Sequence, residues 1–102
     1  MKEIKVIFRK VRWTNPDGIT YEDIEAFFPE LSSEYGKIDG CCRDEGWFSA
    51  NLEWYWNSNP VTESEYKEFL EWLQENMFDK DEKLVVRKRL TYSDLTAAWI
   101  KR

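Results

Sequence analysis

The stretch RWTNPDGITYEDIEAFFPEL, residues 12–31, decides the fold of this chain because it is compatible with two structures. In the first, the chain turns at NPDG, residues 15–18, and forms a β-hairpin. In the second, a strand and a loop lead into a short helix over residues 20–28. The hairpin gives the element order β-β-β-β-α-β, whereas the helix gives β-α-β-β-α-β, the ferredoxin-like pattern.

Two features of this stretch favour the hairpin. Pro16 suits the second position of a type I turn, Asp17 the third, and Gly18 takes the positive φ that follows in a hairpin bulge. Pro29 comes directly after two phenylalanines, so a helix over 20–28 would end at its most apolar point. We therefore predict a hairpin whose second strand presents three residues to the core, namely Ile24, Ala26 and Phe28.

The remaining elements follow from the spacing of apolar residues. Further strands are predicted over residues 3–13, 37–42, 47–56 and 84–90. One long helix begins with a capping box between Thr62 and Glu65, and its apolar stripe consists of Tyr66, Phe69, Leu70, Leu73 and Met77. Thr91 or Ser93 would cap a last short helix carrying Leu95, Ala98 and Trp99. Together these elements predict one α+β domain over residues 1–102, with a mostly antiparallel sheet of four to five strands and the main helix on one face.

The composition limits the classes of function. The chain has six Trp, a net charge of −5 and no His. Without His, the commonest general acid–base group is missing and a metal site has few ligands to use. No stretch reaches the ~20 apolar residues of a membrane span. We therefore predict a soluble, cytoplasmic protein that is not an enzyme and has no cofactor, no metal and no membrane contact.

The two cysteines, Cys41 and Cys42, are adjacent. Neighbouring residues of a strand point to opposite faces, and a disulfide between them would need a strained ring. We therefore predict two reduced thiols, one buried and the other exposed or at an edge.

Charge is distributed unevenly along the chain. Residues 1–13 and 84–102 each carry +4, whereas residues 14–83 carry −13. The simplest explanation is that basic strands and acidic helices neutralise each other. Beyond that, the predicted helix places three glutamates beside a tryptophan, opposite its apolar stripe. This helix ridge, which would bind a basic protein partner through charge and an aromatic anchor, consists of Glu68, Glu71, Glu75 and Trp72.

The sequence leaves a second function open, which is nucleic-acid binding. If the two terminal strands pair, four arginines could form one basic patch, namely Arg9, Arg12, Arg87 and Arg89. In the predicted strand over 47–56, Trp47 and Tyr55 would share one face and could stack on bases. The net charge of −5 repels phosphates, so we expect a protein partner rather than a nucleic acid. The sequence is also compatible with a homodimer.

Three short pieces of the chain carry a resemblance. These are VIFRK (6–10), DIEAFFPEL (23–31) and VVRKR (85–89). Their arrangement resembles a type of small hypothetical protein found on phages and plasmids. No activity is attached to that type, so the resemblance transfers no catalytic residue. It implies a mobile-element origin and a bacterial host, and suggests an inhibitor of a host nucleic-acid-binding defence enzyme.

Overall fold

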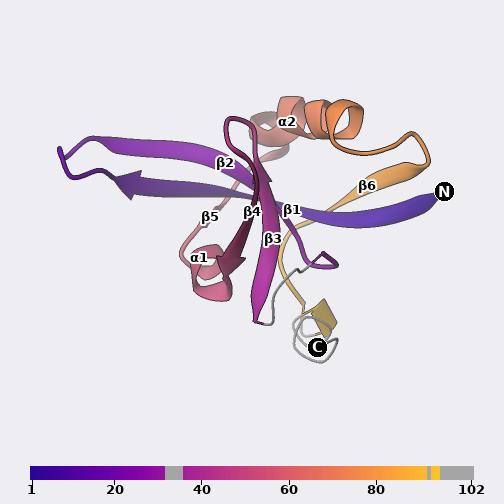
Figure 1. The fold of residues 1–102 in the computed structure, drawn as a ribbon, viewed down its shortest axis with the longest axis horizontal. Helices are drawn as coiled ribbons and strands as arrows, with labels where there is room; N and C mark the ends of the chain where they lie inside the picture. Colours follow the sequence, from indigo (N-terminus) through magenta and orange to yellow (C-terminus); the bar gives the residue numbers. More distant parts are fainter. Residues whose placement is uncertain (32–35, 92, 95–102) are drawn as a thin grey trace.

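A computed structural model describes residues 1–31, 36–91 and 93–94 of the chain (Figure 1). The elements, in chain order, are β1 (Lys2–Thr14), β2 (Thr20–Phe28), β3 (Lys37–Cys42), β4 (Gly46–Asn51), α1 (Leu52–Trp56), β5 (Asn59–Pro60), α2 (Glu63–Asn76) and β6 (Glu82–Arg87). In this part of the chain, neither helix is long and apolar enough to cross a lipid bilayer. The body of the predicted last helix, with Leu95, Ala98 and Trp99, lies outside the described residues.

The strands form one mixed sheet with β1 near its centre. The order is β4-β3-β2-β1-β5, and β6 also pairs with β1. All pairs are antiparallel except β1 with β6, which run parallel from Lys2↔Glu82 to Ile7↔Arg87. The predicted α+β class, with a mostly antiparallel sheet and one main helix, is therefore confirmed. The described residues form six strands rather than four to five, because the two-residue strand β5 gives no signal in the sequence.

Residues 12–31 form the predicted hairpin. β1 and β2 pair from Ile7↔Phe27 to Thr14↔Thr20, and Gly18 has a φ of 83°. The Asn15 side chain fixes the turn, because its Oδ1 accepts hydrogen bonds from the backbone N–H groups of Asp17 and Ile19 at 3.0 and 2.9 Å. Residues 20–28 are strand throughout, so the ferredoxin-like order is not the observed one.

Gly18→Val is expected to lower the free energy of unfolding by about 1 kcal/mol or more, because a β-branched residue resists positive φ. A Cβ at this position would meet nothing within 4 Å, so the loss would come from the backbone alone. Urea denaturation measures it. Gly18→Asn is the control, since Asn tolerates this conformation and should lose clearly less. Equal losses for the two variants would contradict the account of the turn.

Both faces of the sheet are covered, and each has its own core. The first core lies under α2, joins the even-numbered residues of β1 and β2 to the helix, and consists of Ile4, Val6, Phe8, Ala26, Phe28, Cys41, Phe69, Leu73 and Leu84. The second lies on the opposite face under α1 and consists of Ile7, Phe27, Ile38, Leu52 and Tyr55. The predicted core positions Ile24, Ala26 and Phe28 all pack in the first core, which confirms them. Cys41 and Cys42 are both buried, so the prediction of an exposed second thiol is wrong. Cys42 ends β3 at a position where β2 does not pair with it, which agrees with the alternative of a thiol at an edge.

The predicted strand over 47–56 is correct only up to Asn51. From Leu52 the chain forms the helix α1, which buries Leu52 and Tyr55. Two residues three apart lie on one side of a helix but on opposite sides of a strand, so only the helix buries both against the second core. Trp and Tyr favour strands in general, and here burial of this pair outweighs that preference.

The helix α2 begins as predicted. Thr62 is its N-cap, and the capping box with Glu65 is present. The backbone N–H of Thr62 donates to Glu65 Oε1 at 3.0 Å, and Glu65 also forms an ion pair with Lys10 of β1. Hydrogen bonds from Lys10 and from the backbone and side chain of Thr62, together with the charge of Lys10, lower the pKa of Glu65 to about 2. The capping residue Glu65 therefore also connects α2 to β1 through its ion pair with Lys10.

Thr62→Ala is expected to lower the free energy of unfolding by about 0.5–2 kcal/mol, because the N-cap hydroxyl is lost. The Thr62 hydroxyl lies 3.0 Å from both Ser64 Oγ and Glu65 Oε1. Thr62→Ser keeps a hydroxyl there and should stay close to the unmodified protein. An unchanged urea midpoint for Thr62→Ala would count against the capping box.

Candidate functional site

A cleft opens where the β1–β2 hairpin and the β3–β4 hairpin separate. β2 pairs with β3 only over Ala26–Phe28, so the rest of the first hairpin extends away from the sheet, to the left in Figure 1. The space between this arm and the β3–β4 turn has a volume of about 360 Å³. We call it the tryptophan cleft, and its lining consists of Trp13, Asp23, Glu25, Cys42, Asp44, Glu45 and Trp54.

Four of the lining side chains are carboxylates. Asp23 and Glu25 alternate along β2 on the face turned away from α2, and Asp44 and Glu45 form the β3–β4 turn. Glu25 is 8% exposed, and its Oε1 accepts a hydrogen bond from Trp54 Nε1 at 2.7 Å. Burial raises the pKa of Glu25, the charges of Asp23 and Glu45 act in the same direction, and the Trp54 hydrogen bond opposes them. The cleft therefore concentrates negative charge around one buried carboxyl group.

Two tryptophans form walls of the cleft, and both remain partly exposed. Trp13 and Trp54 each keep 40% of their surface accessible. Trp13 stacks on Tyr21 across the hairpin, with 5.6 Å between ring centroids, which holds its ring in place. Tryptophan faces attract cations, most of all where carboxylates lie nearby. Charge and rings together favour a cationic side chain as the occupant.

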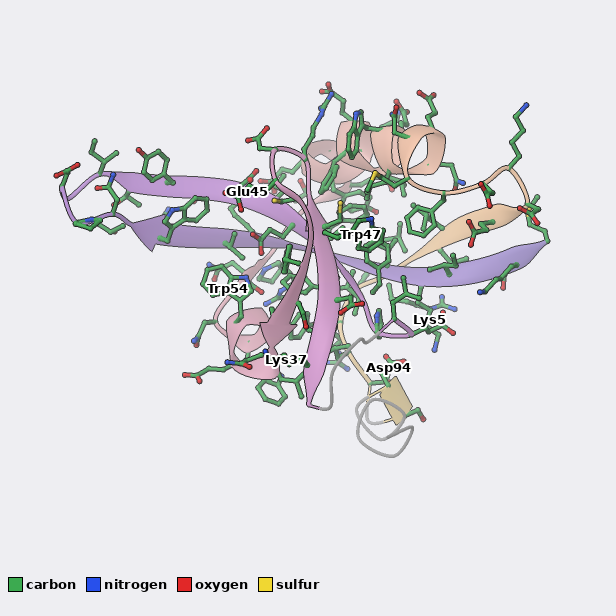
Figure 2. The ribbon with its side chains drawn as sticks, in the orientation of Figure 1. Lys5, Lys37, Glu45, Trp47, Trp54 and Asp94 are labelled. Carbon is green, nitrogen blue, oxygen red and sulfur yellow. The ribbon has the colours of Figure 1, made fainter. Side chains whose placement is uncertain are left out.

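A second hollow continues past Trp54 along β4. It has a volume of about 550 Å³ and shares Glu25, Glu45 and Trp54 with the tryptophan cleft. We call it the β4 groove, and its other lining residues are Lys37, Phe48, Ser49, Ala50, Asn51, Glu53 and Asn57. Figure 2 shows Glu45 and Trp54 on one side of the β3–β4 hairpin and Trp47 on the other.

The cysteines at the cleft are not activated thiols. Burial raises the pKa of Cys42, which lines the cleft, and that of the neighbouring Cys41 to about 11. Thiols with raised pKa are poor nucleophiles at neutral pH, since the thiolate is the reactive form. Within residues 1–31, 36–91 and 93–94, no three His, Cys, Asp or Glu side chains are grouped so that they could hold a metal ion.

The helix ridge lies on the far side of the sheet from the cleft. Glu71 and Glu75 are exposed on α2, whereas Glu68 forms an ion pair with Arg43 at 3.3 Å. Arg43 also lies over the ring of Trp72, 5.7 Å from its centroid, and Trp72 is half-buried against the first core. The structure therefore brings the four ridge residues together, with Arg43 between two of them.

The four arginines of the nucleic-acid alternative do not share one face. The terminal strands β1 and β6 do pair, but Arg12 lies an odd number of residues from Arg9 and points to the opposite face. Arg12 forms an ion pair with Glu22 at 2.8 Å. Arg9 donates to the Ser58 hydroxyl and carbonyl oxygens at 2.8 and 2.6 Å and lies over the Tyr55 ring. Arg87 and Arg89 are exposed.

Trp47 and Tyr55, predicted on one strand face, are separated because α1 begins between them. Tyr55 is 4% exposed, and its hydroxyl accepts a hydrogen bond from the Leu90 backbone N–H at 3.0 Å. Trp47 keeps 46% of its surface accessible and packs on Phe28 and Phe78. Of this pair, only Trp47 offers a ring to a ligand.

Sequence reasoning missed the tryptophan cleft, although parts of it left a signal. Asp23 and Glu25 alternate in the predicted hairpin, and Trp13 is placed to face Tyr21 in the register that the NPDG turn sets. Trp54 gave no such signal, because it falls in the second half of the predicted strand over 47–56, where the chain forms α1 instead. No protein-family model, no curated protein and no solved structure matches the chain. The resemblance to phage and plasmid proteins therefore stays a prediction.

Proposed function

We propose that this protein is a non-catalytic protein-binding module that takes a basic segment of its partner in the tryptophan cleft. The observation that carries the proposal is the position of Glu25, a carboxyl group buried among other carboxylates with a tryptophan N–H as its hydrogen-bond donor. Such a group destabilises the fold when it is ionised, because ionised groups are costly to bury without a cation. A bound lysine or arginine would supply that cation.

The surroundings of Glu25 fit this occupant. In the part of the chain that the structure describes, Asp23, Glu25, Asp44 and Glu45 form no ion pair with a lysine or arginine. Their combined charge attracts a basic segment at a distance and speeds its approach. Once seated, a guanidinium or ammonium group would contact the rings of Trp13 and Trp54, and aromatic contacts of this kind often dominate binding energy.

The narrower prediction, an inhibitor from a phage or plasmid that binds a host nucleic-acid-binding defence enzyme, belongs to the same proposal. Enzymes that bind nucleic acid present basic grooves, and an acidic cleft is complementary to them. The nucleic-acid alternative has less support, because Arg9 and Arg12 are engaged by Ser58 and Glu22.

Glu25→Gln should change binding and stability in opposite directions. The substitution removes the charge but keeps an oxygen for the Trp54 N–H. A hexapeptide of alternating lysine and valine, used as a probe, should bind about tenfold more weakly by calorimetry, a loss of about 1.4 kcal/mol. The variant should also be more stable than the unmodified protein in urea at pH 7, because the buried charge is gone.

The direction in which the stability gain of Glu25→Gln changes with pH follows from the raised pKa. The pKa of Glu25 is raised in the folded protein, so the folded state of the unmodified protein holds its proton more tightly than the unfolded state. Its stability therefore falls as the pH rises from the ordinary glutamate range through the raised pKa. Below this pH range the Glu25→Gln variant should be as stable as the unmodified protein, and above it the variant should be more stable. Glu71→Gln, at an exposed glutamate of α2, is the control and should change neither property; equal weakening by both variants would contradict the proposal.

A further inference from the structure

Among the strands of the described residues, β4 lies at one edge of the sheet. It pairs with β3 on one side from Lys37↔Asn51 to Cys42↔Gly46. On its other side, no strand, turn or loop among the described residues forms hydrogen bonds with its backbone. An edge strand of this kind presents a row of N–H and C=O groups that can pair with another chain.

The hollows beside β4 lie along that edge. The β4 groove is lined by four successive residues, Phe48 to Asn51. Because successive residues of a strand point to opposite faces, a hollow lined by all four reaches the edge of β4. Its lining also includes Glu25 of β2 and Lys37 of β3, so it extends over the face of the sheet as well. A smaller hollow of about 280 Å³ lies next to it, against Asp39, Trp47, Phe48 and Ser49. The edge is therefore accessible from both faces of the sheet.

We propose that β4 receives an extended segment of the partner as an additional strand, in the mode of β-augmentation. This inference rests on the proposed function and states how the basic segment is held. Main-chain hydrogen bonds to β4 would supply affinity, and alternate side chains would supply selectivity. Side chains on the face of the groove meet three carboxylates, Glu25, Glu45 and Glu53, and one cation, Lys37. The net charge of this lining is negative, so these side chains should be basic. Those on the other face meet the ring of Trp47, with Asp39 beside it, and should be apolar where they contact the ring.

Charge argues against a second copy of this chain as the added strand. Two copies of β4 related by a two-fold axis would run antiparallel. Glu45 and Glu53 lie just beyond the two ends of β4, in the β3–β4 turn and in α1. In such a pairing the Glu45 end of one copy approaches the Glu53 end of the other, twice over, and like charges brought together repel each other. A basic segment would instead place cations near Glu45 and Glu53, so the electrostatic interaction at both ends of β4 becomes attractive.

Backbone methylation of the probe separates strand addition from simple charge attraction. The alternating lysine–valine hexapeptide is compared with two versions, N-methylated at its odd or its even positions. The N–H groups of a strand point alternately to its two edges. If the peptide adds to β4, one methylated version should bind at least about tenfold more weakly and the other nearly as well as the parent. Amide hydrogen exchange should also slow at alternate residues between 46 and 51.

The outcomes distinguish this inference from the proposed function. Binding that neither methylation weakens, with unchanged exchange in β4, overturns strand addition and leaves the basic-segment proposal in place. Binding that both methylations weaken equally, without protection in β4, also overturns it. If no version of the peptide binds at physiological salt, the proposed function fails and strand addition fails with it.

Discussion

Phe27→Ala is expected to lower the free energy of unfolding by about 3–5 kcal/mol, as for other fully buried phenylalanines. The Phe27 side chain is 0% exposed and sits in the second core. Its ring packs edge-on against Phe48 of β4 and Tyr55 of α1, with centroid distances of 5.8 and 5.5 Å. The truncation therefore loosens the contact among three elements that border the site. Chemical denaturation in urea measures the loss.

Phe27→Leu is the control for this prediction. Leucine fills most of the volume, so the loss should be clearly smaller, and the difference between the two variants reports the aromatic contacts. If Phe27→Ala cost less than about 1 kcal/mol, the second core would not be packed as described. The position of α1, and with it the Trp54 wall of the cleft, would then be in doubt.

The double charge reversal Asp44→Lys, Glu45→Lys is expected to weaken binding of the lysine–valine hexapeptide by about 100-fold, or about 2.7 kcal/mol. Both residues lie in the β3–β4 turn and are exposed, so the fold should be unaffected. Two attractive charges at the cleft become two repulsive ones. The loss should shrink as salt is raised, because salt screens exposed charges. Calorimetry at low and at physiological salt measures both effects.

The reversal Glu71→Lys, Glu75→Lys on the helix ridge is the matched control, since it changes the net charge by the same amount. It should slow association modestly and leave dissociation unchanged, because it alters only the long-range field. If the ridge variant lost more affinity than the turn variant, the site would be the ridge of Glu68, Glu71, Glu75 and Trp72. The cleft proposal would then be wrong.

Local signals explain which parts of the fold could be predicted. The hairpin follows from Pro16, Asp17 and Gly18, whose preferences act within the turn itself. The start of α2 follows from the Thr62–Glu65 capping box in the same way. In contrast, α1 has only five residues, too few to be stable alone, and it exists because the second core buries Leu52 and Tyr55. No local pattern carries that information.

The candidate site could be predicted less well than the fold. The carboxylates of β2 and of the β3–β4 turn are at least nineteen positions apart along the chain. They face one cleft because β2 is paired with β3 only from Ala26 onward, so that the two hairpins separate before this residue. That separation depends on the pairing of whole strands. The ridge on α2 was easier to see because helical spacing puts its residues together. The sequence could therefore indicate the ridge, which lies on one helix, but not the cleft, which is formed by two hairpins.

The most direct test of the central claim follows the indole N–H resonances of the tryptophans by NMR while the lysine–valine hexapeptide is added. Each resonance is assigned by a single Trp→Phe substitution. If a basic segment binds in the tryptophan cleft, the Trp54 and Trp13 signals should move in a saturable manner while the Trp72 signal stays in place. Movement of the Trp72 signal with Trp54 and Trp13 unchanged would contradict the claim and place the contact on α2.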